Sequence, residues 1–582
     1  MVRPFSGKGM TTTANDQRFA WPANGLVGAV DFAVASHARA VAVLVVVALL
    51  AFLPGFFQIP PIDRDEARFA QATKQMVESG DYIDIRYQKE IRYKKPVGIY
   101  WLQAGVVKVA ETLGVPNART KIWLYRIPSL LGAIGAVLLT YWAALAFVSR
   151  RAALLAGLMM ASSILLGVEA RLAKTDAMLL ATVVAAMGVM ARAYLGDPRM
   201  QRTGPAGWTL PAIFWTALAA GVLLKGPLIL MFVGLAAATL FMLDRSARWC
   251  LALRPLPGVV WMVALVLPWF FAIVSRAGDS FFAESLGHDM LAKVASSQEA
   301  HGAPPGYYLV LFWLTFWPAA TLAAMAAPAV WAARREKGAK FLLAWIVPAW
   351  IVFELVVTKL PHYVLPLYPA IAILIAGIVD QRVLSRVPWL VRGASWWFVL
   401  PVILAIGGIA GLMIYGRQIG LLAWPFAAGA VILGLFAWRL YEADGAERSL
   451  LRGVAASVLI AITLYAVVVP SLQALFPSAV LGRIMRVADC ANPVAASAGY
   501  HEPSLVFLAG TTTRLTDGAG AADFLRQGGC RFALVEGRHE RSFLRRAEAI
   551  GLRYAPVSRV EGINIAIGRQ ISMAVYRSEG LP

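Results

Sequence analysis

Long apolar runs separated by short polar breaks dominate the chain from Val41 to about residue 474. Runs of this kind are typical of membrane-spanning helices, because about 20 apolar residues cross the hydrocarbon core of a bilayer. The first forty residues are polar and mixed and show no cleavable signal sequence, so we expect the first run to remain as an anchor. We expect thirteen spans, near residues 41–57, 127–148, 152–168, 177–195, 211–224, 227–243, 258–274, 306–331, 341–357, 363–379, 396–415, 420–438 and 453–474.

Residues 96–115 are also apolar but contain Lys108 and Glu111. If this segment does not span, the strongly basic breaks between later spans all lie on the N-terminal side of the membrane, as the positive-inside rule requires. We therefore predict that it is an interfacial amphipathic helix. The N-terminus is then cytoplasmic, the C-terminus lies outside, and residues 58–126 form one long external loop.

The composition changes after about residue 476, where apolar runs shorten and glycine, arginine and acidic residues return. This change predicts three parts: a cytoplasmic segment 1–40, a transmembrane catalytic domain 41–475 and a small external α/β domain 476–582. In the last part we expect strands at Ser504–Ala509, Phe532–Val535 and Ile571–Tyr576, and helices at Ala521–Gln527 and Ser542–Ile550.

The three cysteines exclude a disulfide-rich scaffold. Cys490 and Cys530 lie in the external part, where a disulfide can form. The sequence leaves open whether they are bridged or are two small core residues.

The composition excludes several classes of protein. With 59% hydrophobic and 15% charged residues, the chain is neither an ordinary soluble enzyme nor a disordered protein. The net charge of +21 can be explained in two ways: basic residues in cytoplasmic breaks orient the spans, or basic residues bind a polyanionic ligand. The 19 tryptophans suit membrane interfaces better than a nucleic-acid groove, so we expect no nucleic acid. Glycine-rich phosphate loops and G-x-S-x-G elbows are missing from the sequence, which disfavours an ATP-driven machine and a serine hydrolase.

The first external loop carries twelve Lys/Arg against eight Asp/Glu. This excess indicates either contact with lipid headgroups or a phosphate site, for which Lys95 is well placed just before Pro96. Asp65 and Asp176 follow two different apolar runs at the same membrane level. Charges at span ends are costly unless they face a polar cavity or a partner, so a shared cavity is the simplest account, with ordinary solvated residues as the alternative.

Other external breaks place polar side chains at the same membrane level as Asp65 and Asp176. They either anchor the ends of the spans or belong to one common site: Lys225, Arg276, Lys359, His362 and Tyr363. Carboxylates among cations suit group transfer that involves phosphates. Glu284 and His288 are spaced to share a metal on a helix, but a third ligand is not evident.

Five motifs in order resemble the GT-C glycosyltransferases: Asp65–Trp101, RIPSLLGAIGAV at Arg126, RLAKTDA ending after Asp176, LLKGP at Lys225 and KLPHYVLPLYP at Lys359. Within that superfamily the chain is most similar to the aminoarabinose (4-amino-4-deoxy-L-arabinose) lipid A transferases. The resemblance implies an α-helical polytopic membrane protein with about thirteen transmembrane helices and a small C-terminal soluble α/β domain.

The resemblance also implies roles for single residues. Asp65 and Asp176 match the catalytic carboxylates, and Lys95 matches a cation that binds the polyprenyl phosphate. Helpers at the donor phosphate and lipid are expected at Arg68, Lys225, Arg276 and Tyr363. Candidate substrate-binding residues are Glu66, Tyr82, Lys94, Arg171, Lys359 and His362. Relatives often carry an acid before the matching lysine, whereas Lys94-Lys95 is doubly basic here.

The implied reaction moves aminoarabinose from undecaprenyl phosphate to a phosphate of lipid A at the outer face of the bacterial inner membrane, which gives resistance to polymyxin and cationic peptides. The expected partners are this lipid-linked donor, the lipid A acceptor and membrane lipids, with a monomeric protein. No cofactor is firmly expected, and a divalent metal stays open. The alternatives are another polyprenyl-phosphate-sugar transferase, such as a protein O-mannosyltransferase, and a lipid transporter.

Overall fold

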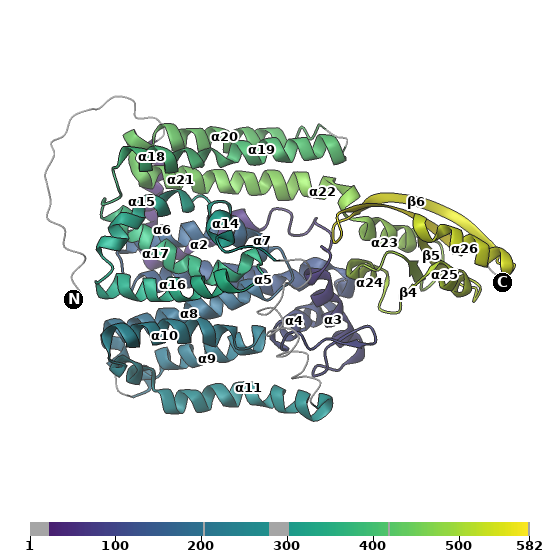
Figure 1. Ribbon diagram of the computed structural model, residues 1–582, viewed down its shortest axis with the longest axis horizontal. Coiled ribbons are helices and arrows are strands. Elements are labelled where there is room, and N and C mark those ends of the chain that lie inside the picture. Colours follow the sequence, from purple (N-terminus) through teal and green to yellow (C-terminus); the bar gives the residue numbers. More distant parts are fainter. Residues whose placement is uncertain (1–22, 202–203, 279–301, 417–418, 580–582) are drawn as a thin grey trace.

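The computed structural model describes residues 23–201, 204–278, 302–416 and 419–579. Most helices lie side by side along the long axis of the molecule, with the C-terminal sheet at one end (Figure 1). The helices of this bundle are α1 (Ala23–Val34), α2 (His37–Phe52), α5 (Ile122–Ala144), α6 (Arg150–Ser162), α7 (Ile164–Ala170), α8 (Asp176–Leu195), α9 (Thr209–Lys225), α10 (Leu228–Asp244), α11 (Pro255–Ala277), α14 (Tyr307–Thr315), α15 (Ala320–Ala332), α16 (Lys337–Leu355), α17 (Tyr368–Asp380), α18 (Pro388–Ser395), α19 (Leu400–Gly411), α20 (Ala423–Arg439), α21 (Tyr441–Ala461) and α22 (Val469–Ser471).

Each apolar run in the sequence falls mainly on one helix or on several consecutive helices. In the described part of the chain, seven helices are long and apolar enough to cross a membrane, and an eighth span is formed if α6 and α7, bent by 61°, count as one. Five shorter apolar helices accompany them. The protein is thus a multi-pass membrane protein, while the count of thirteen spans stays a prediction. Helix α1 lies in the N-terminal segment for which the sequence predicted no element.

The first loop contains helices α3 (Asp65–Ser79) and α4 (Gly98–Thr112) and a short hairpin of β1 (Arg86–Tyr87) with β2 (Glu90–Ile91). Both helices lie at the end of the bundle that faces the C-terminal sheet (Figure 1). Helix α4 is the segment predicted to be amphipathic, and it packs on α3, α5 and α9. Its helical structure is confirmed, and its place at the membrane interface stays a prediction.

The C-terminal part is a five-stranded sheet of order β4-β3-β5-β7-β6. Its strands are β3 (Val494–Ala498), β4 (Arg514–Thr516), β5 (Arg531–Glu536), β6 (Tyr554–Asn564) and β7 (Arg569–Ser578). Strands β3, β4 and β5 are parallel, and β7 joins β5 and β6 antiparallel. Side chains alternate between two apolar clusters, so both faces of the sheet are covered. The covering helices are α23 (Pro477–Val487) and α24 (Pro503–Ala509) on one face, and α25 (Gly518–Leu525) and α26 (Gly537–Ala549) on the other.

One predicted strand was wrong. Residues Ser504–Ala509 form helix α24, which starts at Pro503 and buries Leu505, Val506 and Phe507. A short apolar run fits a buried strand or a buried helix equally well, and proline at the first helical position favours the helix. The strands at Phe532–Val535 and Ile571–Tyr576 and both predicted helices are confirmed within a few residues.

Cys490 and Cys530 form a disulfide that closes a loop of 40 residues in this sheet. The bridge, one of the two alternatives that the sequence left open, is therefore present.

Candidate active site

Two carboxylates occupy equivalent places at the ends of two helices. Asp65 is the first residue of α3 and Asp176 the first residue of α8. Asp65 is exposed, whereas Asp176 is buried. The backbone N–H groups at a helix start carry partial positive charge, which attracts the carboxylate at both positions.

The loops that carry these two acids are tied together by Glu66. The buried guanidinium of Arg126 in α5 donates to both Glu66 oxygens at 2.8 and 2.9 Å. The backbone N–H of Ala173, in the second loop, donates to Glu66 Oε1 at 2.9 Å, and that of Ile62 donates to Glu66 Oε2 at 2.9 Å. One carboxylate therefore fixes the first loop, α5 and the loop before Asp176 relative to one another.

Arg126 completes this junction with its remaining N–H groups. They donate to the carbonyl oxygens of Phe56, Ile59 and Pro60 at 2.8–3.1 Å. A guanidinium is tolerated in the protein interior only when its N–H groups have hydrogen-bond acceptors and its charge has a partner, as here.

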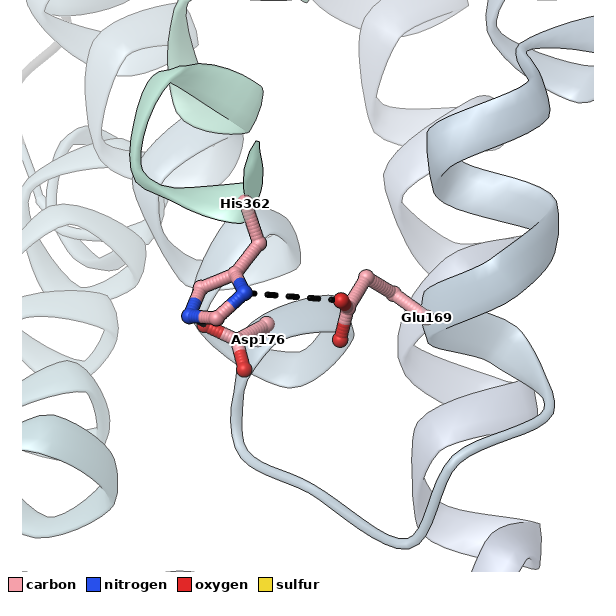
Figure 2. A group of neighbouring side chains, drawn as sticks. All are labelled: Glu169, Asp176 and His362. Carbon is pink, nitrogen blue, oxygen red and sulfur yellow. Dashed lines mark ion pairs between the residues drawn. The ribbon is translucent and has the colours of Figure 1, made fainter. Parts of the chain in front are cut away.

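A compact cluster of charges surrounds Asp176. Lys225, the last residue of α9, donates to Asp176 Oδ1. Lys174 lies 3.7 Å from Asp176 Oδ2 and 3.1 Å from Glu169 Oε1. Figure 2 shows the ring of His362 between Glu169 and Asp176, with Nδ1 3.6 Å from the first carboxylate and Nε2 3.6 Å from the second. Four elements, α7, α8, α9 and the turn Pro361–Leu367, thus meet at one buried point.

Lys174 connects this cluster electrostatically to the first loop. Burial alone would lower the pKa of its ammonium group, but the nearby carboxylates outweigh burial and raise that pKa above its ordinary value. Glu169 and Asp176 contribute most of this effect, and Asp65 adds to it. Asp65 therefore lies close enough to Lys174 to act on it electrostatically, and the shared cavity stays a prediction.

Glu169, Asp176 and His362 offer ligand atoms within 4.8 Å of one another and could in principle hold a metal ion. The two ring nitrogens of His362, however, face different carboxylates (Figure 2). Two ammonium groups already neutralise the carboxylates. The donor set fits a network of ion pairs better than a cation site. Glu284 and His288, the other metal candidates, lie outside the described residues.

Lys95, the cation expected at the donor phosphate, lies three residues before the start of α4. Lys94 is exposed, and Lys95 is partly buried just before Pro96. Gly98, the first residue of α4, lies so close to the backbone of Leu223 in α9 that a Cβ would be 2.7 Å from its carbonyl oxygen. This close approach brings Lys95 to the end of α9, where Lys225 lies 5.6 Å from the centre of the Tyr363 ring.

Two further candidates, Arg276 and Tyr82, each bond to a neighbouring part of the protein. Arg276, at the end of α11, donates to Asp81 at 2.7 Å, and both side chains are exposed. Next to Asp81, the carbonyl oxygen of Tyr82 accepts from the indole of Trp101 at 2.7 Å. Arg68 follows Asp65 by one helical turn in α3 and is partly buried.

Two other candidates lie among backbone carbonyl groups. The buried ammonium of Lys359 donates to the carbonyl oxygens of Phe353, Glu354 and Val356 at the end of α16. All three of its N–H donors are thereby used, as in a helix C-cap. The buried guanidinium of Arg171 donates to Pro54 and to two further carbonyls, and it stacks on Tyr465.

Sequence reasoning did not single out Glu169, Lys174 or Arg126 as parts of the site. Glu169 and Arg126 are single charges inside apolar helices, which is a signal for a buried partner. The sequence contains no information on which distant residue that partner is.

The architecture is a helical bundle in which two helices start with acidic residues close to cations, with an α/β domain at one end. The structure matches the crystal structure of ArnT from Cupriavidus metallidurans bound to undecaprenyl phosphate with a TM-score of 0.69, over 92% of this chain and 97% of that chain at 19% identity. The fold class predicted from the sequence is therefore confirmed.

Sequence comparison confirms the predicted resemblance to the aminoarabinose transferases. The chain is 28% identical over 411 residues to the undecaprenyl phosphate-α-4-amino-4-deoxy-L-arabinose arabinosyl transferase of Edwardsiella ictaluri, which is 70% of either chain. It is 27% identical over 397 residues to the protein of the same name from Pseudomonas aeruginosa, covering 67% of this chain and 69% of that one. The model of the dolichyl-phosphate-mannose-protein mannosyltransferase family matches residues 42–277.

Proposed function

We propose that this protein transfers 4-amino-4-deoxy-L-arabinose from undecaprenyl phosphate to a phosphate of lipid A. The observation that carries the proposal is the cluster in which Asp176 pairs with Lys174 and Lys225, with Asp65 of the first loop close enough to act electrostatically on Lys174. Cations beside ionised carboxylates suit a phosphate-linked sugar that develops positive charge during transfer. The likeness to relatives named for this activity supports the choice of sugar.

In the proposed reaction the bond between the sugar anomeric carbon and the donor phosphate oxygen breaks, and a bond to an acceptor oxygen forms. Lys95 binds the departing phosphate, with Arg68, Arg276 and Lys225 contributing positive charge and Tyr363 a polar ring. Lys225 also holds Asp176 in place. An acceptor phosphate is already ionised near neutral pH, so Asp65 is not needed as a base and instead orients the acceptor or stabilises the developing sugar cation.

The other sequence candidates divide by their contacts. We propose structural roles for Glu66, Arg171 and Lys359, because each is buried and bonded to the surrounding protein. His362 belongs to the cluster around Asp176. Lys94 and Tyr82 are more accessible and remain candidates for substrate contact.

We further propose that the protein works as a monomer in the bacterial inner membrane. The N-terminus is then cytoplasmic, and the first loop and the C-terminal domain lie in the periplasm. The basic breaks between the spans support this orientation.

A second candidate function is transfer of another polyprenyl-phosphate-linked sugar to a hydroxyl group, which the match to the mannosyltransferase family favours. A hydroxyl acceptor requires a carboxylate base, and the exposed Asp65 could serve as one.

Mass spectrometry of lipid A separates these functions. A strain that lacks its own aminoarabinose transferase is complemented with this gene or with its Asp65→Asn variant. A mass increase of one aminoarabinose, seen only with the unaltered gene, is expected. Unmodified lipid A together with newly glycosylated protein would support the second function instead, and unmodified lipid A alone would contradict the first.

A further inference from the structure

The C-terminal domain contacts the first loop along the whole of α3. One face of this helix presents Gln71, Lys74 and Glu78, spaced three and four residues apart. Thr511 of the C-terminal domain bonds with Gln71 at 2.9 Å and with Glu78 at 2.6 Å. The buried ammonium of Lys74 donates to the carbonyl oxygen of Phe507 at 2.9 Å.

The hairpin that follows α3 is held by the same turn of the domain. The amide of Gln88 donates to the carbonyl oxygens of Thr511 and Thr513 at 3.1 and 2.6 Å. The ring of Phe507 packs edge-on against Tyr125 of α5, with centroids 5.3 Å apart. The interface is therefore continuous from the bundle to the tip of the first loop.

The residue just before Asp65 has an unusual backbone conformation. Arg64 caps α3 with φ 68° and ψ −117°, a region that a residue with a side chain rarely adopts. Such a conformation is strained and persists only where surrounding contacts impose it. One such contact is visible: the Arg64 guanidinium donates to the carbonyl oxygen of Ala566.

Ala566 lies at the tip between β6 and β7, which reaches back from the sheet toward the bundle (Figure 1). Asn564 shapes this tip, because its side chain accepts from the Ala566 N–H at 2.9 Å and donates to Glu502 at 2.8 Å. The turn that carries the carbonyl group bound by Arg64 is therefore itself held by hydrogen bonds within the C-terminal domain.

Asp63, one residue earlier, is bound by the same domain. Its Oδ1 accepts from the backbone N–H of Ser504 at the start of α24, at 3.0 Å. The hydroxyl of Ser504 donates to Ser478 at 2.6 Å, and Ser478 is bonded to Tyr500. Both residues that lead into Asp65 are therefore held from outside the membrane domain.

We propose that the C-terminal domain is a positioning element for the transfer reaction: by holding Asp63 and Arg64 it fixes where α3 begins and so directs Asp65 toward Lys174 and Asp176. This inference rests on the proposed role of Asp65. Arg64 and Ala566 act through Asp65 and do not contact the reacting atoms.

The test shortens the β6–β7 tip. Residues 565–568 are replaced by Asn-Gly, a two-residue turn that joins paired strands, so the sheet is kept and the Ala566 carbonyl is lost. We expect kcat to fall about tenfold or more, as a small misplacement of a reacting group produces. Binding of undecaprenyl phosphate is expected to stay within about twofold, because this change leaves the lysines in place.

Two variants of Arg64 separate backbone conformation from side-chain loss. Arg64→Ala keeps the cost of the positive φ and loses the contact, so its kcat should fall. Arg64→Gly removes that cost and should retain more activity than Arg64→Ala. Arg553→Ala is the matched control, since this exposed arginine lies before β6, at the far end of the strand from the tip; its kcat should not change.

Hydrogen exchange gives a readout that does not depend on activity. Faster exchange in the first turn of α3, with unchanged exchange in β5, is expected for the tip variant. Full kcat in the tip variant, while Asp65→Asn abolishes transfer, would overturn the inference. So would loss of donor affinity with kcat retained, or unfolding of the whole sheet together with α3. If the protein transfers another sugar, the proposed function fails, but the same comparison is made with that sugar.

Discussion

The carboxylate of Glu66 and the guanidinium of Arg126, 60 residues apart in the chain, are joined by two hydrogen bonds of 2.8 and 2.9 Å. Both side chains are essentially fully buried. Since Glu66 also accepts from Ala173, this pair is the junction between the two loops that carry Asp65 and Asp176.

Removing one member of this pair should be costly. Arg126→Met leaves a buried carboxylate without its cation, and we expect the free energy of unfolding to fall by about 3–5 kcal/mol. Thermal unfolding in detergent measures this loss. The double variant Arg126→Met/Glu66→Leu should lose less than the sum of the single variants, and strictly additive losses would contradict a direct interaction.

Lys95→Ala should weaken binding of undecaprenyl phosphate by about tenfold, the value of one charge-assisted hydrogen bond. Lys94→Ala is the matched control, because it removes the same charge from the adjacent, exposed position and should have a smaller effect. Equal affinities of the two variants, measured by titration with undecaprenyl phosphate, would show that Lys95 does not bind the donor phosphate.

Chelation should leave transfer almost unchanged. We expect less than about a twofold decrease with EDTA, because Lys174 and Lys225 already neutralise the carboxylates around His362. The measurement is the initial rate before and after dialysis against the chelator. A large loss that Mg²⁺ or Mn²⁺ restores would show that a cation does enter the cluster.

Stability should depend on pH through Asp63. Burial, partly offset by the bond from Ser504, raises the pKa of this carboxyl from 3.8 to about 6. The folded protein therefore binds this proton more tightly than the unfolded chain, and stability should decrease as the pH rises from about 4 to about 6. The decrease amounts to about 3 kcal/mol at most.

Thermal unfolding across this pH window tests the expectation against Asp63→Asn, which cannot titrate. The difference in unfolding free energy between the two proteins should vary with pH below about 6 and be constant above it. Parallel curves over the whole range would mean that Asp63 titrates normally.

Reduction of the Cys490–Cys530 disulfide should destabilise the C-terminal sheet. For a loop of 40 residues, chain entropy alone predicts about 4 kcal/mol. The measurement compares thermal unfolding with and without a reductant in a Cys250→Ser background, where no other thiol remains. The same midpoint under both conditions would argue against this stabilisation.

The sequence was sufficient to predict most helices of the bundle, because long apolar runs have few alternatives in a membrane. It also placed Asp176 and Lys225 at the same membrane level, and the structure joins them in an ion pair. It could not predict that Glu66 binds Arg126 rather than remaining open to substrate. Such pairings depend on how helices pack, and spacing along the chain does not encode them.

The same limit applies to Lys359 and Arg171. Their positions near motif residues suggested substrate contact. The structure instead surrounds Lys359 with carbonyl oxygens at the end of α16, and Arg171 with carbonyl oxygens of α7 and of the end of α2. Helix α24 was missed for a different reason: a run of seven residues is too short for periodicity to separate helix from strand.

The contact between Asp63 and Ser504 also bears on biogenesis, since it joins residues 441 positions apart in the chain. In the proposed orientation, the first loop is synthesised and crosses the membrane long before the segment that holds it. On our account, a ribosome-bound or truncated product already has its lysines for the lipid donor but does not yet have its first carboxylate in place. Sugar transfer would then begin only when translation and export of the last domain are complete.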